Sequence, residues 1–261
     1  MPSAYAHYRF GAQLLKRMPP DFCRTAQRFR QLYDVGLHGP DIYFYYSPLM
    51  KTSVGSLGSK LHHQSGIEFF TRACKRLRLE PSEAGYAYLY GLLSHYCLDS
   101  VCHPFVNARA AEGKMGHVEL ETEFDRYLLV QDGKTPPSTH DISRHMKLTR
   151  GECATAASFY PAVTASAISR SVRNMALATR CLAMPQGLPR NVMEKGLHKF
   201  GGKYAQFLMT DDPNPICAPL NGKLEALYNT ALERYPRLWE QLTAHLAHNA
   251  PLGADFAPEF G

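Results

Sequence analysis

The stretch from Tyr88 to His103 constrains the fold more than any other part of the sequence. It reads Tyr-Leu-Tyr-Gly-Leu-Leu-Ser-His-Tyr-Cys-Leu-Asp-Ser-Val-Cys-His, an apolar helical pattern that contains His95 and Asp99. Residues four apart lie on one face of a helix, so this imidazole and this carboxylate are neighbours. A carboxylate on a buried helix must be hydrogen-bonded, paired or bound to a metal. We therefore predict a core helix with a functional polar face, and Pro104 predicts its end.

A second pair with the same spacing follows at His117 and Glu121, and His103 stands at the junction between the two pairs. Taken alone, such a pair is more often a solvated helix face than a pair of ligands. Two pairs on neighbouring helices, however, are the arrangement from which facing helices of a bundle build multi-metal centres. The sequence therefore predicts a metal site between helices.

The rest of the chain also reads as helical. No segment alternates with period two for long, whereas apolar residues recur at helical spacing along most of the chain. Residues 47–60, rich in Gly and Ser, predict a loop. We predict an all-α fold in one domain over residues 1–261, with metal-ligand motifs in 7–121 and a helical remainder in 149–250.

Composition and charge exclude little. The net charge of +6 permits attraction to anionic lipid or nucleic acid, but no block of five basic residues marks a dedicated binding surface. Seven cysteines, an odd number without a pattern, indicate a reducing compartment. No secretory signal and no apolar stretch of transmembrane length is present. We therefore expect a cytoplasmic protein without a transmembrane segment.

The candidate ligands are histidines and carboxylates without cysteine thiolates, a set that suits zinc or another first-row metal in a hydrolytic site. Three carboxylates leave two or three bound divalent ions with an excess of positive charge, which favours an anionic substrate such as a phosphate ester. The candidates, in chain order, are His7, Asp41, His62, His95, Asp99, His103, His117 and Glu121.

Three motifs carry a family resemblance: Ser94-His-Tyr-Cys-Leu-Asp99, Cys102-His-Pro-Phe-Val-Asn-Ala108 and Gly116-His-Val-Glu-Leu-Glu121. In succession they resemble the metal-ligand motifs of the bacterial zinc-dependent phospholipase C family, an all-α phosphodiesterase family related to the fungal single-strand nucleases. Gly39-Pro-Asp-Ile and His7-Tyr-Arg-Phe-Gly resemble its remaining motifs. The resemblance implies hydrolysis of a phosphate ester, with phospholipids among the candidate substrates.

The resemblance also implies two complete zinc sites and part of a third. The ligands of the first would be Asp41, His62, His95 and Asp99, and those of the second His103, His117 and Glu121. His63 competes with His62, and the distance to Phe69 along the sequence favours His62.

For the third ion, the resemblance implies Asp99 as a bridge together with His7. The better-known enzymes complete that site with the amino group and carbonyl of an amino-terminal tryptophan, whereas the single tryptophan here is Trp239. We therefore expect two tightly held zinc ions and a third that is weak or absent.

Asp41 is the candidate general base. It follows a Gly-Pro turn instead of a helix, so we expect it to lean over the metals and take a proton from the attacking water. The resemblance places a zinc-contacting aspartate at the same position.

Two alternatives belong to other functional classes. One is a helical phosphohydrolase of the His-Asp dipeptide class, for which His140-Asp141 is the single candidate dipeptide, although it lies in a polar, Pro-containing loop. The other is a metal-stabilised binding or scaffold protein that keeps the fold without turnover.

Overall fold

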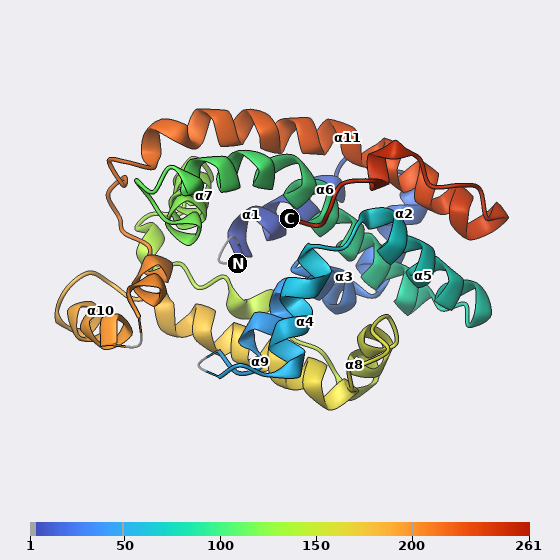
Figure 1. Ribbon diagram of the computed structural model, residues 1–261, viewed down its shortest axis with the longest axis horizontal. Coiled ribbons are helices and arrows are strands. Elements are labelled where there is room, and N and C mark those ends of the chain that lie inside the picture. The colour runs from blue at the N-terminus through green and yellow to red at the C-terminus, as the bar shows by residue number, and fades with distance from the viewer. Residues whose placement is uncertain (1–3, 49, 200) are drawn as a thin grey trace.

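Helix α6 (Glu83–Ala111) runs through the middle of the molecule, and helices from both ends of the chain pack against it (Figure 1). Ser82 caps its start, because the Ser82 side chain accepts a hydrogen bond from the backbone of Gly85. Every residue from Ala87 to Asp99 is buried, because neighbouring helices cover all of its faces. The apolar stretch recognised in the sequence is therefore the core of the fold.

The structure is a computed structural model and describes residues 4–48, 50–199 and 201–261. The other α-helices are α1 (Ala4–Leu14), α2 (Pro20–Arg28), α3 (Arg30–Gly36), α4 (Ser53–His62), α5 (Gly66–Leu79), α7 (His117–Gln131), α8 (Arg150–Ala157), α9 (Ala165–Leu182), α10 (Leu188–Lys199) and α11 (Asn221–His248). Short 3-10 helices are η1 (Gly39–Tyr45), η2 (Pro137–Thr139), η3 (Ser143–His145), η4 (Gly202–Phe207), η5 (Ala218–Leu220) and η6 (Ala254–Phe256). No strand forms within these ranges, so the all-α prediction is confirmed.

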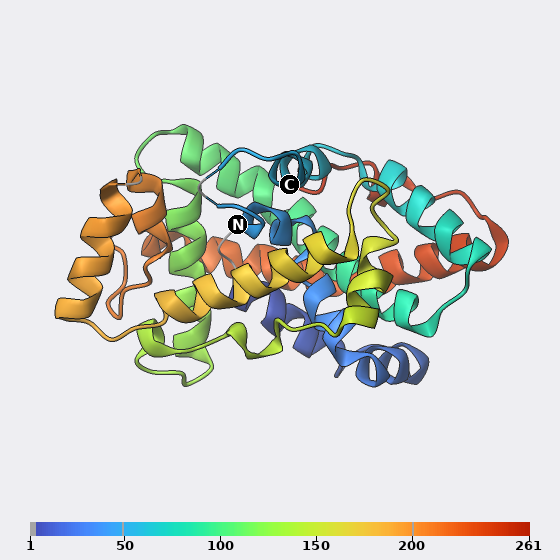
Figure 2. The same cartoon turned by 90° about the horizontal axis from the view of Figure 1, so that it is seen from below.

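The long helices α9 and α11 lie on opposite sides of α6 (Figures 1 and 2). Helix α11 packs along α6, and the tyrosine hydroxyl of Tyr235 donates to the carbonyl of Tyr90 at 3.1 Å. Helix α3 crosses α6 so closely that a Cβ on Gly91 would overlap the backbone of α3. This crossing brings the residues just after α3 beside the polar face of α6.

Two local predictions were wrong. Helix α6 does not end at Pro104 but continues to Ala111. A proline inside a helix costs about 3 kcal/mol, yet His103 and Val106 on either side of it are buried, and packing of this part against α1 and α7 outweighs the local preference.

The Gly/Ser-rich segment 47–60 is not a loop throughout, because α4 begins at Ser53. The side chain of Thr52 accepts a hydrogen bond from the backbone of Gly55 at 3.0 Å and starts the helix. Helix α4 then packs against η1 and buries Leu61 and His62. Tertiary packing thus overrides the weak helix propensity of glycine.

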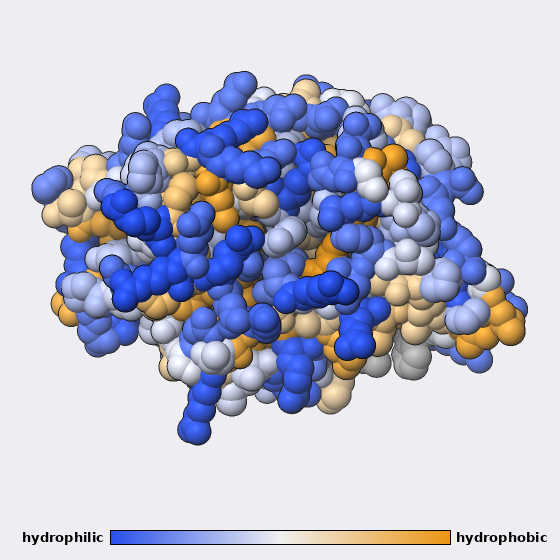
Figure 3. Space-filling model, turned by 180° about the vertical axis from the view of Figure 1, so that it is seen from behind, coloured by the Kyte–Doolittle hydropathy of each residue, from blue (hydrophilic) through white to orange (hydrophobic). Residues whose placement is uncertain are grey.

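Figure 3 shows the molecule from the side opposite to that of Figure 1. This face is largely hydrophilic, and its apolar side chains form small, separate patches. Within the described ranges, no helix combines the length and the apolar character needed to cross a membrane.

Candidate metal centre

The eight predicted ligands come from five elements and meet in three groups along the polar face of α6. Helix α1 supplies His7, η1 supplies Asp41, α4 supplies His62, α6 supplies His95, Asp99 and His103, and α7 supplies His117 and Glu121. In each group the ligand atoms lie within 4.8 Å of one another. The structure thus brings together residues that are more than one hundred positions apart in sequence.

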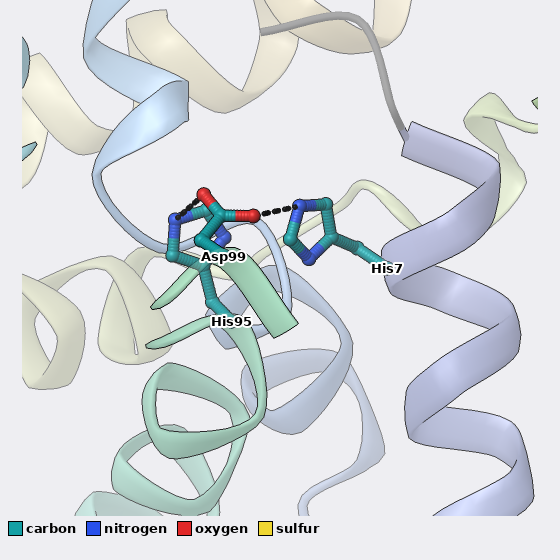
Figure 4. Close-up of side chains that lie close together, drawn as sticks. All are labelled: His7, His95 and Asp99. Carbon is teal, nitrogen blue, oxygen red and sulfur yellow. Dashed lines mark ion pairs between the residues drawn. The ribbon is translucent and has the colours of Figure 1, made fainter. Parts of the chain in front are cut away.

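Asp99 joins α1 to α6 (Figure 4). One carboxylate oxygen lies 3.1 Å from Nε2 of His7 and the other lies 3.2 Å from Nε2 of His95. The rings of His7 and His95 stack with centroids 4.5 Å apart. These three residues form the first group.

His95 also belongs to the second group, with Asp41 and His62. Nε2 of His62 lies 2.9 Å from the carboxylate of Asp41. Asp41 therefore does not sit on an open turn, as expected, but inside the 3-10 helix η1, where its side chain is buried against α4. At the first position of this helix, Gly39 takes a positive φ of 46° and approaches the His95 ring so closely that a Cβ there would overlap it, so glycine is required at this turn into η1.

The third group lies one helical turn further along α6 and continues onto α7. Nε2 of His103 lies 3.2 Å from Glu121, and Nε2 of His117 lies 3.1 Å from the same oxygen. Nε2 of His103 is also 3.6 Å from Asp99. Because one imidazole nitrogen contacts both carboxylates, the three groups form one continuous centre.

Neighbouring polar groups fix the orientation of three ligand rings. Nδ1 of His62 donates to the carbonyl of Gly58 at 2.8 Å, and Nδ1 of His95 lies 3.3 Å from the carbonyl of Leu37. Nδ1 of His117 is 2.9 Å from the side-chain oxygen of Asn107. An imidazole that donates through Nδ1 presents the lone pair of Nε2, which is how metal-binding histidines are usually held.

Asp125 positions α1, and with it His7. Its two oxygens accept hydrogen bonds from the backbone of Tyr5 at 2.9 Å and of Ala6 at 2.8 Å. These bonds satisfy donors at the start of α1. The sequence analysis did not single out Asp125 or Asn107, because each acts through a hydrogen bond between separate segments and neither is itself a candidate ligand.

The electrostatics of the centre call for cations. Burial alone would raise the pKa of Glu121, but hydrogen bonds from His103 and His117 outweigh it and lower that pKa to about 2. Burial likewise opposes the charged form of His103, yet Asp99 and Glu121 raise its pKa to about 9. The buried carboxylates thus remain ionised and stabilise positive charge beside them, carried by a proton or by a metal ion.

His95 behaves differently from His103. Burial lowers the pKa of His95 to about 4, and the neighbouring histidines His7 and His62 act in the same direction. A neutral imidazole is the form that binds a metal.

The residues present fit zinc. Each of the eight predicted ligands has a buried side-chain nitrogen or oxygen without a hydrogen-bond partner. Such atoms are costly unless a further group satisfies them. Imidazole nitrogens and carboxylate oxygens within one small space are the donors that zinc takes in hydrolytic sites.

Comparison with known families matches residues 6–164 to the family described as zinc dependent phospholipase C. The match covers more than half of the chain and contains all eight predicted ligands. The chain belongs to the zinc-dependent phospholipase C family. The resemblance found in the sequence is therefore confirmed. No curated protein and no solved structure matches the chain.

The other candidate histidines lie outside the three ligand groups. The side chain of His63 is 76% exposed and pairs with Glu259, so His62 and not His63 faces the centre. Nε2 of His38 lies 2.7 Å from Nε2 of His145. Neither histidine belongs to the three ligand groups formed by the described residues.

The His-Asp dipeptide at His140 and Asp141 lies in the loop between η2 and η3 and not on a helix. Asp141 accepts a hydrogen bond from the backbone of Ser143. Neither residue belongs to the three groups found among the described residues. The dipeptide-type phosphohydrolase alternative therefore lacks a structural basis.

Proposed function

We propose that this chain is a zinc-dependent hydrolase that cleaves phosphodiester bonds in the manner of a phospholipase C. The observation that carries the proposal is the convergence of the eight ligand residues, each with an unsatisfied buried atom, in a chain of this family.

We propose two complete zinc sites and one incomplete site. His95 belongs to two of the groups. We assign it to the first ion, which would be held by Asp41, His62 and His95 of the second group, with Asp99 beside it. The second ion would be held by His103, His117 and Glu121. His7 and Asp99 would contribute to a third ion, which we expect to be weak or absent.

The protein itself sets the charge of the reaction site. When bound, zinc supplies Lewis acidity that offsets negative charge on a phosphate ester and acidifies water. The centre contains three negative charges, on Asp41, Asp99 and Glu121. Two divalent ions carry four positive charges, so one positive charge remains. The remaining positive charge favours a phosphate ester over a neutral ester. This positive charge attracts a phosphate group strongly, because the buried side chains exclude water, which would otherwise screen the interaction.

Asp41 is the proposed general base. Burial alone would raise its pKa, but His62 and His95 help to lower it, so the carboxylate is ionised and able to accept a proton. It lies at 2.9 Å from one imidazole of the centre, in the first turn of the short helix η1 instead of on α6. From there it would orient the attacking water and take its proton as the phosphorus–oxygen bond forms.

We propose a phospholipid as the substrate class, supported by the description of the family. We also propose a cytoplasmic location. It is supported by the seven cysteines, all of which are free in the structure, as expected in a reducing compartment.

Hydrolysis assays test the proposal. Purified protein would be stripped of metal with EDTA, reloaded with zinc, and assayed on bis(p-nitrophenyl) phosphate, phosphatidylcholine vesicles and single-stranded DNA. We expect zinc-dependent hydrolysis, fastest on the phospholipid. His95→Ala should abolish it, and His245→Ala is the matched control because His245 is also buried and hydrogen-bonded through Nδ1 but lies outside the ligand groups.

Zinc that binds stoichiometrically without hydrolysis of any of the three esters would overturn the proposal and favour the metal-stabilised scaffold. Hydrolysis confined to DNA would retain the chemistry but overturn the phospholipid assignment.

A further inference from the structure

The predicted ligands are largely buried, and the cavity beside four of them is too small for a phosphodiester. His95 is fully buried, and His117 is the most exposed predicted ligand, with 28% of its side chain accessible. The cavity lined by His7, Asp99, His103 and Glu121 has a volume of about 30 Å³. Since a water needs at least roughly 10–15 Å³ in this measure, the cavity holds about two waters. A phosphodiester can enter this cavity only if part of its cover moves.

Residues 253–261, which we call the strap, lie against three of the ligands, His62, His95 and His103. After α11 the chain turns back and runs to the middle of the molecule, beside α4 and α6 (Figure 1). The first part of the strap is firmly anchored to α11. Asp255 pairs with Arg237 at 2.9 Å and accepts a hydrogen bond from Gln241 at 2.8 Å, while its carbonyl accepts from Arg234.

The tip of the strap, residues 259–261, is held differently. It lies beside the segment between α4 and α5, where Phe260 donates its backbone N–H to Gln64 at 3.3 Å and Gly261 donates to the carbonyl of His62 at 3.1 Å. Neither bond involves a charge, and the Glu259 side chain pairs only with the exposed His63. The main anchor of the tip is the ring of Phe260, which is buried and packs against Phe69, Phe70 and Tyr96. Lifting the tip exposes this ring, whereas moving the first part of the strap breaks charged pairs.

The tip also touches both ends of the metal centre. Gly261 is bonded to the backbone of His62, and it lies so close to the ring of His103 that a Cβ would overlap that ring. Phe260, which precedes it, is buried with its ring centroid 6.3 Å from that of His95. A substrate approaching from this side would meet the strap before it met the ligands.

We propose that the tip of the strap is an autoinhibitory cover: residues 259–261 close the metal centre, and they must lift from the His62–Gln64 backbone before a phosphodiester can bind. The inference rests on the proposed function, since the excluded molecule is its substrate. The first part of the strap remains fixed to α11 while the tip opens and closes.

The test compares the full chain with a variant lacking residues 259–261 and with Gly261→Ala, whose methyl group displaces the tip from His103. Glu259→Gln is the control, since it changes a surface pair and keeps the tip. For each protein we would measure zinc content, kcat/KM on bis(p-nitrophenyl) phosphate, and the rate at which a chelator removes zinc.

If the open state has a population of about 1–10%, removing the cover should raise kcat/KM by about tenfold or more. Zinc removal should accelerate in parallel, zinc content should be unchanged, and Glu259→Gln should behave as the full chain. Gly261→Ala should move both rates in the same direction, so the proposal stays testable if the shortened chain folds poorly.

Unchanged or slower hydrolysis with full zinc content would overturn the proposal, and so would loss of zinc, because the strap would then hold the centre together instead of covering it. If no protein hydrolyses any ester, the proposed function fails, and the chelator rates still decide whether the strap covers the metals.

Discussion

Helices α1–α7, with η1, carry all eight predicted ligands, whereas α8–α11 and the strap carry none. The later elements act on the same centre through packing and backbone atoms: α11 lies along α6, and Gly261 bonds to the carbonyl of His62. The comparison teaches that the first half of the chain supplies every ligand of the centre, while the second half contributes to its enclosure through packing and backbone atoms.

A comparison of two histidines separates burial from function. His95 and His245 are both buried, each directs Nδ1 to a backbone carbonyl, and each leaves Nε2 without a hydrogen bond. His95 lies 3.2 Å from Asp99 and shares two ligand groups, whereas His245 belongs to none of those formed by the described residues. Nearby carboxylates, and not burial alone, distinguish a ligand from a structural histidine.

The largest expected effect is that of His95→Ala. Because His95 is shared by two groups, the variant should lose zinc from the Asp41 side of the centre and show no hydrolysis above background. His245→Ala should keep its zinc and activity and lose stability alone. Elemental analysis measures the zinc content of both variants, and a hydrolysis assay measures their activity. Equal zinc loss in the two variants would contradict the distinction between a ligand histidine and a structural histidine.

A smaller effect is expected for Asp41→Asn, which keeps the size and one ligating oxygen but removes the basicity. We predict that kcat falls by roughly 10²–10⁴, the range usual for loss of a general base, with most zinc retained. Near wild-type hydrolysis would exclude Asp41 as the base. A protein purified without zinc would show that Asp41 is chiefly a ligand.

The smallest effect is expected for His7→Ala. His7 belongs to the incomplete third site, so its loss should remove less zinc than the loss of His95. The zinc-to-protein ratio of the two variants after dialysis measures the difference. A His7 variant that loses as much zinc as the His95 variant would show that α1 is essential to the tightly held ions.

Much of the centre could be predicted from the sequence because helical spacing is a local property. The pairs His95 with Asp99 and His117 with Glu121 lie one turn apart on helices that do form, and the structure places both pairs in the ligand groups. The choice of His62 over His63 also agrees with its contact to Asp41.

Other features could not be read locally. Helix α6 continues past Pro104 because α1 and α7 pack on its later turns, and α4 forms in a Gly-rich segment because η1 covers it. The strap carries no chemical signature at all, since it meets the centre through glycine and backbone atoms. Predicting these features requires the tertiary contacts that outweigh local propensity.

The most direct test of the account is to locate zinc in crystals of the protein by anomalous scattering at the zinc edge. The account predicts two strong peaks within about 2.0–2.2 Å of ligand atoms, one at Asp41, His62 and His95 and one at His103, His117 and Glu121, with a weak peak or none between His7 and Asp99. Strong peaks elsewhere, or no peak at either group in zinc-containing crystals, would contradict it.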